Sequence, residues 1–135
     1  MTLEQIKDWL KGVIDVGDGI AVGSIDGTKE RFIGVYLWDK VSDRQRICIG
    51  GTEATVYQIK ALTILIHWTM SAVQAESKAQ EIYQLLYGSS DLVIEGTQVY
   101  FIDPGAGPIQ IGKDENGIYE FIINARITYK RRETI

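Results

Sequence analysis

The chain has 135 residues, of which 45% are hydrophobic and 24% are charged, a composition typical of a globular protein and not of a disordered tail or a fibre. Its formal net charge of -4 provides no general attraction for phosphate backbones or anionic lipid, and domains that bind nucleic acid are more often basic. The single cysteine, Cys48, excludes an internal disulfide.

A short amphipathic helix is predicted at the start of the chain. Thr2 and Gln5 have the spacing of a capping box, in which each side chain accepts a hydrogen bond from the other residue's backbone N–H. The glycine-containing stretch at residues 15–19 ends the helix. Its apolar residues recur at helical spacing: Leu3, Ile6, Leu10, Val13 and Ile14.

Two strands are predicted next, over residues 19–24 and 31–38, and the second is rich in aromatic and β-branched residues. Between them stand Asp26 and Gly27, a pair that tolerates positive φ angles. Such a pair favours a tight hairpin, so the two strands are expected to be antiparallel.

The longest predicted strand runs from residue 57 to residue 68, and its second half is apolar on both faces. This pattern favours a central strand covered on both sides, or a strand with a bulge near Thr63. Before it, the polar residues 39–46 predict a loop, residues 46–49 a short strand, and residues 50–52 a further break.

The clearest predicted helix follows at once. Ser71 and Gln74 have capping-box spacing, and Gly88 stands where the helix is expected to end. The predicted apolar face consists of Val73, Ala75, Ala79, Ile82 and Leu86, and the predicted outward face of Glu76, Lys78, Gln80, Glu81 and Gln84.

The last third of the chain predicts strands over residues 92–94, 98–102, 108–112 and 118–130. Asn116-Gly117 is a strong hairpin signal between the last two. The apolar face of the final strand is expected to carry Tyr119, Phe121, Ile123, Ala125, Ile127 and Tyr129. The order of elements predicts an α+β fold, a mostly antiparallel β-sheet with two main helices packed on one face, as a single domain over residues 1–135.

No catalytic, cofactor-binding or metal site is predicted. His67 is the only histidine and lies within a strand pattern, which favours a structural role, and Cys48 lacks the setting of a reactive thiol. The glycine-containing stretches at residues 17–19 and 50–52 lack the features of nucleotide-binding loops. Paired carboxylates fall on an exposed helix face or a hairpin tip, where they are normally solvated. We therefore expect no enzyme and no cofactor.

Large rings near the ends of elements are typical anchors of protein interfaces. The basic residues at 130–132 are more often a solubilising strand end than a nucleic-acid contact. The residues predicted to lie at an interface are Trp38, Trp68, Tyr87, Asn116, Lys130, Arg131 and Arg132.

Several segments together resemble a family of virus proteins. They are Gly50-Gly51-Thr52, Tyr57-Gln58-Ile59-Lys60, Leu65-Ile66-His67-Trp68-Thr69, the helix residues Glu76, Ala79, Ile82 and Tyr83, the hairpin from Gly112 to Tyr119, and the strand from Asn124 to Tyr129. The series is similar to the minor capsid proteins of tailed bacteriophages, and especially to the tail-terminator (tail-to-head joining) proteins of long-tailed phages.

The resemblance implies a virion structural protein of the tail or neck, made in the host cytoplasm. It implies a ring, expected to be a hexamer, that caps the finished tail tube and docks to the head. The implied partners are other copies of the chain, the tail tube protein and a head-completion or neck protein, with DNA only as the genome passing through the channel. No membrane segment is expected, because no apolar run approaches the length of a span and the first residues lack signal-peptide features.

Other functions stay open beside this one. A head-completion (stopper or adaptor) protein of the neck is close to the terminator, and a small nucleic-acid-binding α+β module and a small enzyme follow. The ring size, the strand edges that meet and the oligomeric state of the isolated chain are also left open by the residue pattern.

Overall fold

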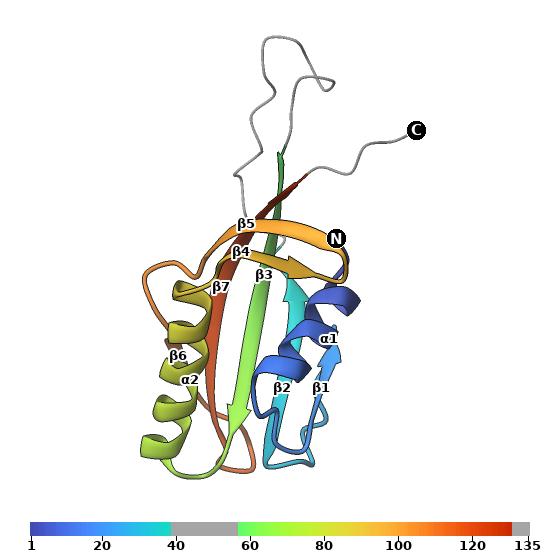
Figure 1. Cartoon of the computed structure of the whole chain (residues 1–135). Coiled ribbons are helices and arrows are strands. Elements are labelled where there is room, and N and C mark those ends of the chain that lie inside the picture. Colours follow the sequence, from blue (N-terminus) through green and yellow to red (C-terminus); the bar gives the residue numbers. More distant parts are fainter. Residues whose placement is uncertain (39–56, 131–135) are drawn as a thin grey trace.

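The computed structural model of the chain describes residues 1–38 and 57–130, and over these residues it is an α+β structure (Figure 1). The predicted loop at 39–46, the predicted strand at 46–49 and the break at 50–52 lie outside the described residues. The elements are α1 (Leu3–Val13), β1 (Gly19–Val22), β2 (Arg31–Leu37), β3 (Tyr57–Trp68), α2 (Ala72–Tyr87), β4 (Ser90–Ile94), β5 (Thr97–Asp103), β6 (Ile109–Lys113) and β7 (Tyr119–Lys130).

The strands form one sheet with the order β1-β2-β3-β7-β5-β4, and β6 pairs with β7 beside this path. All pairs are antiparallel except β1 with β2, which run parallel with Gly19 opposite Phe32 and Val22 opposite Val35. The predicted Asp26-Gly27 hairpin is therefore wrong.

The physical reason lies in residues 23–30, which return along the sheet before β2 begins. Ile25 lies against Gly34, whose missing side chain leaves room for it: a Cβ there would meet the Ile25 Cγ2 atom at 2.7 Å. Asp26 forms a local turn instead of a hairpin, because its Oδ1 atom accepts hydrogen bonds from the Thr28 N–H and hydroxyl.

β3 lies between β2 and β7, as the prediction of a central strand requires, and its register with both neighbours runs without interruption past Thr63. The predicted alternative of a bulge near Thr63 is wrong. Irregular registers occur instead in β5, between Val99 and Phe101, and in β6, between Gln110 and Gly112.

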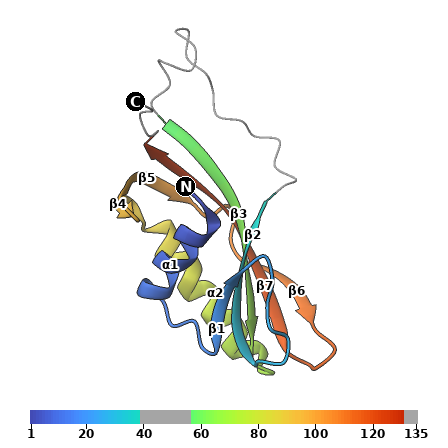
Figure 2. The same ribbon diagram turned by 90° about the vertical axis from the view of Figure 1, so that its right-hand side faces the viewer.

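Both helices cover the same face of the sheet, as predicted (Figure 2). The predicted apolar face of β7 points toward them, and Tyr119 is its only member that is half-buried and not buried. The buried strand residues under the helices include Ile33, Val35, Leu62, Ile64, Ile66, Ile123, Ala125 and Ile127, and the helices contribute Ile6, Leu10, Ala75, Ala79, Ile82 and Leu86. Each large side chain buried here contributes about 1.5–3 kcal/mol relative to exposure.

The capping box that begins α1 is confirmed. The Gln5 N–H donates to Thr2 Oγ1 at 3.2 Å, and the Thr2 N–H donates to Gln5 Oε1 at 3.0 Å. Ile6 and Leu10 are buried, whereas Val13, in the last turn of the helix, is 44% exposed. The capping box fixes the first turn of α1 and so places these two residues in the core.

The start of α2 differs in detail from the predicted capping box. Ser71 Oγ accepts from the Gln74 N–H at 3.3 Å, but the Ser71 N–H donates to Thr69 Oγ1 at 3.2 Å. Because Thr69 satisfies this donor, the Gln74 side chain is not needed for it. The helix ends at Gly88, as predicted.

Two residues of α2 face the opposite way from the prediction. Val73 is 78% exposed, whereas Lys78 is only 7% exposed. Helical geometry explains both, because Lys78 falls between Ala75 and Ile82 on the core side, and Val73 falls on the far side. Lys78 is tolerated there because its stem lies along Trp68 while its ammonium group keeps a carboxylate partner.

The predicted β6–β7 hairpin is confirmed. Asp114 organises it, since its Oδ1 atom accepts from the N–H groups of Asn116 and Ile118, both at 2.9 Å. Gly117 supplies the left-handed backbone with φ of 80°.

Candidate functional site

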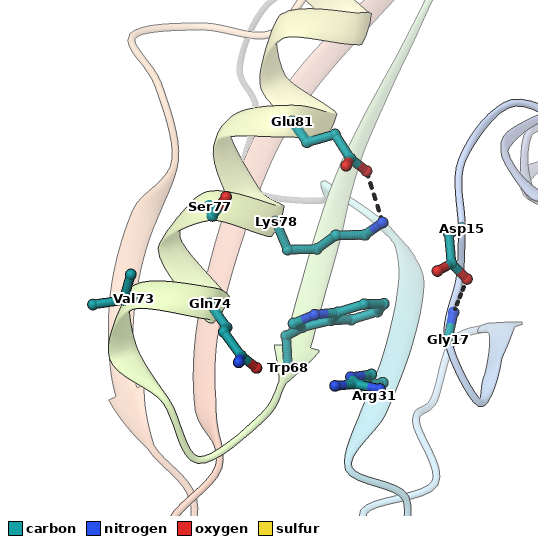
Figure 3. Close-up of a pocket in the computed structure, with 9 residues that line it drawn as sticks. All are labelled: Asp15, Gly17, Arg31, Trp68, Val73, Gln74, Ser77, Lys78 and Glu81. Carbon is teal, nitrogen blue, oxygen red and sulfur yellow. Dashed lines mark hydrogen bonds and ion pairs between the residues drawn. The ribbon is translucent and has the colours of Figure 1, made fainter.

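A pocket of about 430 Å³ opens between the turn after α1 and the first half of α2 (Figure 3). Trp68, the last residue of β3, lies between the two sides. The lining residues are Asp15, Gly17, Arg31, Trp68, Val73, Gln74, Ser77, Lys78 and Glu81.

Trp68 stands between two cations. Lys78 Nζ lies 4.7 Å from its ring centroid and Arg31 Cζ lies 6.0 Å from it, and Figure 3 shows the two side chains on opposite faces of the ring. The ring itself is 7% exposed. Trp68, predicted to lie at an interface, therefore closes one end of the core and offers little surface of its own.

Two charged side chains of the pocket have partners within the chain. Lys78 Nζ forms an ion pair with Glu81 Oε2 at 2.7 Å, and Asp15 Oδ1 accepts from the Gly17 N–H at 2.9 Å. Among the described residues of the lining, Ser77 carries the only hydroxyl, Asp15 and Glu81 carry carboxylates, and there is no histidine. Such an arrangement can hold a side chain of another molecule.

His67 is fully buried and ties three segments together. Its Nδ1 atom lies 3.0 Å from Glu120 Oε2 on β7, and its Nε2 atom lies 3.0 Å from the Lys29 carbonyl oxygen in the loop before β2. Asp114 Oδ2 of the β6–β7 hairpin lies 3.7 Å from Nε2. Both ring nitrogens are thus occupied by structural partners, in keeping with the structural role expected of this residue.

The other predicted interface residues do not converge on one place. Trp38 is half-buried with Arg126 Cζ 4.5 Å from its ring centroid, and Lys130 is exposed at the end of β7. Asn116 lies at the hairpin before the other end of that strand, roughly 35–40 Å from Lys130 for a strand of this length. Arg131 and Arg132 lie outside the described residues.

Tyr87, another predicted interface residue, is 68% exposed. Its ring stacks on that of Tyr83 with the centroids 6.1 Å apart. The Tyr83 hydroxyl donates to the Gly105 carbonyl oxygen at 2.9 Å, which holds the pair in place. Tyr87 is therefore a pre-ordered aromatic group on the solvent face of α2.

Two surfaces were not found by reasoning from the sequence. The first, called here the outer band, crosses the face of the sheet that the helices leave bare. The register places Gly34, Leu65, Ile122 and Ile109 side by side across β2, β3, β7 and β6. The alternation of β7 is a signal for this band, because Ile122 is an apolar residue on the strand face opposite Phe121 and Ile123.

The second surface, called here the α2 stripe, runs along the helix opposite its core-facing side. Its members recur at intervals of three and four, all are exposed, and none is charged. They are Val73, Ser77, Gln80, Gln84 and Tyr87.

Two further findings concern metal binding and membrane crossing by the described residues. Within residues 1–38 and 57–130, no group of three or more His, Cys, Asp or Glu side chains is placed to hold a metal ion. Neither α1 nor α2 combines the length and the apolarity that crossing a bilayer demands.

Comparison with known proteins identifies the family. Searches of curated proteins and of solved structures gave no significant match. The family model described as bacteriophage tail terminator protein matches residues 10–131, which is nearly the whole chain. The matching family is that of the tail terminator and not that of a head-completion protein. The chain therefore belongs to the bacteriophage tail terminator protein family.

Proposed function

We propose that the chain is the subunit of a ring that ends the growing tail tube and offers the surface to which the head docks. The observation that carries this proposal is the family match over residues 10–131, which makes the chain a structural component of the phage tail and of the virion. We expect a hexamer, with the tail tube protein on one side of the ring and a neck protein on the other.

The distribution of surfaces supports a ring. Helices cover one face of the sheet, whereas only residues of loops and hairpins lie against parts of the other, so each subunit has two different surfaces on opposite sides (Figure 2). A closed ring built from heterologous contacts requires two different patches per subunit. The net charge of -4 favours solubility before assembly and limits adhesion of DNA passing through the channel.

The same proposal includes several properties that follow from a purely structural role. Residues 1–135 act as one terminator-like domain, made in the host cytoplasm, with no enzymatic activity and no cofactor. The Trp68 pocket supports this, because among its described lining residues the Ser77 hydroxyl is not hydrogen-bonded to a carboxylate that could act as its base. The pocket is suited to receive a side chain from a neighbouring tail protein.

Tail-tube assembly in the presence of the purified chain tests the proposal. Tube subunits are polymerised with and without the chain, and electron microscopy measures tube length and the density at tube ends. We expect added chain to stop elongation and to leave a ring at one end of each tube. Tubes that elongate equally in both samples and have bare ends would overturn it. Binding to DNA-filled heads but not to tube ends would identify a head-completion protein instead.

A further inference from the structure

The outer band is unusual for the solvent side of an antiparallel sheet. Strands with one face in water normally alternate apolar and polar residues, and the outward positions are polar. Here the outward position of β3 is Leu65, that of β7 beside it is Ile122, and that of β6 beside them is Ile109. Ile109 is 52% exposed, and Leu65 and Ile122 are half-buried with no helix above them. Gly34, at the other end of the row, is buried beneath Ile25, so the free part of the band is Leu65, Ile122 and Ile109. A continuous apolar row in such a place indicates a contact surface.

The polar residues on either side of the band are already satisfied within the chain. On one side Thr63 Oγ1 donates to Asn124 Oδ1 at 2.6 Å, and on the other His67 Nδ1 lies 3.0 Å from Glu120 Oε2. Covering a polar group is costly when the group loses its partner, but these groups keep theirs. A second molecule can therefore cover the band and its borders at little desolvation cost.

The α2 stripe has the composition of an interface centre. Charged residues are depleted at the centres of protein interfaces and tyrosine is enriched. None of the five stripe residues is charged, although 24% of the chain is. Val73 and Tyr87 stand at its two ends, and the stacking of Tyr87 on Tyr83 reduces the side-chain entropy that binding would remove.

We propose that the α2 stripe of one copy packs on the outer band of the next copy. This proposal rests on the ring function above and names the contact that would build the ring. Figure 2 shows α2 on one side of the sheet, and the band lies on the other side, so the contact runs head to tail. It leaves one stripe and one band free at the ends until the ring closes. A contact of band with band would instead give a closed pair and leave the stripe in water.

The dimensions agree with this arrangement. From Val73 to Tyr87 the stripe extends about 21 Å along the helix axis. β3 and β7 each have 12 residues and extend roughly 40 Å. A helix from a neighbour can therefore lie along the part of these strands that precedes His67 on β3, because Lys29 and Asp114 already cover His67 itself. The neighbour's α2 would cover the bare face of the sheet much as the chain's own α2 covers the other face.

Cysteine cross-linking tests the contact directly. In a Cys48→Ser background, Gln80→Cys marks the stripe and Ile109→Cys marks the band, both at exposed positions. Lys11→Cys on the exposed side of α1 is the matched control. Each sample is treated with a short bis-maleimide, with and without tail tubes. We expect the mixture of Q80C and I109C chains to give several-fold more linked dimer than either chain alone or than mixtures with K11C.

A second pair of variants gives an independent readout. Gln80→Lys and Ile109→Lys place a charge at the centre of each surface, and each variant alone is expected to lose self-association in solution or on tube ends. Mixed together they keep one intact junction, formed by the stripe of the I109K chain and the band of the Q80K chain. We expect a dimer with twice the subunit mass of 15.1 kDa and nothing larger. Circular dichroism of each variant is the control that checks whether it is folded.

The outcomes separate this contact from the ring function. I109C chains that link to one another, or cross-linking no higher than with K11C in both conditions, would overturn the contact. If tubes are capped while the stripe and band do not link, the terminator function stands and the contact fails. If stripe and band link but tubes elongate freely, the contact stands and the proposed function fails.

Discussion

Replacing Gly17 by alanine should destabilise the protein more than replacing Gly23 or Gly12 by alanine. Gly17 has φ of 65°, a left-handed conformation that costs an alanine about 1–2 kcal/mol. A Cβ at this position would also lie 2.5 Å from Arg31 Cβ and 2.9 Å from Trp68 Cη2. Relieving such overlap in a packed region costs typically about 1–3 kcal/mol. The two costs sum to about 2–5 kcal/mol, a large part of the roughly 5–15 kcal/mol that stabilises a domain.

Two other glycines separate the two costs. Gly23 has φ of 75° but no atom within 4 Å of a built Cβ, so Gly23→Ala should lose only the conformational part, about 1–2 kcal/mol. Gly12 lies inside α1 with nothing within 4 Å, so Gly12→Ala should stabilise the protein by about 0.5–1 kcal/mol.

Urea denaturation followed by far-ultraviolet circular dichroism measures the series, at one low protein concentration so that self-association does not contribute. From most to least stable, the expected order is Gly12→Ala, wild type, Gly23→Ala and Gly17→Ala. A Gly17→Ala variant as stable as Gly23→Ala would contradict the close packing of residue 17 against Arg31 and Trp68.

Three further changes test other parts of the structure. Ile64→Ala, in the buried centre of β3, should lower the free energy of unfolding by about 2–5 kcal/mol in urea titrations, and a loss below about 1 kcal/mol would contradict its burial under the helices. Thr63→Val removes the donor to Asn124 Oδ1 and should cost about 1–3 kcal/mol, whereas an unchanged urea midpoint would show that this hydrogen bond does not stabilise the sheet. The side-chain and backbone hydrogen bonds from Thr28 lower the pKa of Asp26, so its contribution to stability is present above the unfolded pKa and is lost as pH falls through the folded pKa. Thr28→Ala should move the Asp26 pKa back up toward its ordinary value in a carboxyl NMR titration, and an unmoved pKa would show that the Thr28 side chain is not the cause.

The elements themselves could largely be predicted from the sequence, because their signals are local. β3 begins and ends at the predicted residues, and the hairpin at Asn116 follows from a dipeptide with a strong intrinsic turn preference. Asp26-Gly27 has a similar local turn preference, but the hairpin predicted from it is wrong. A dipeptide cannot report that the following residues pass back along the sheet, which is a property of the packing of Ile25 on Gly34.

The candidate site was harder to predict from the sequence than the fold. Lys78 was expected in water because lysine usually lies there, and its place on Trp68 depends on the angle between α2 and the end of β3. The outer band depends on the register of four strands, two of which lie more than fifty residues apart in sequence at Leu65 and Ile122. No periodicity within one strand contains that information.

The centre of the sheet also has a consequence for the way the chain folds. β3 is completed by β7, and Ile64 pairs with Ile123, so the largest ladder joins segments that are distant in sequence. Closing such long loops before any contact is gained makes folding slow, in the range of milliseconds to seconds for sheets of this kind. During synthesis one edge of β3 stays without its partner until residues 119–130 have left the ribosome. β7 is thus the strand that covers the free edge of β3. The nascent protein is most prone to aggregation just before β7 emerges from the ribosome.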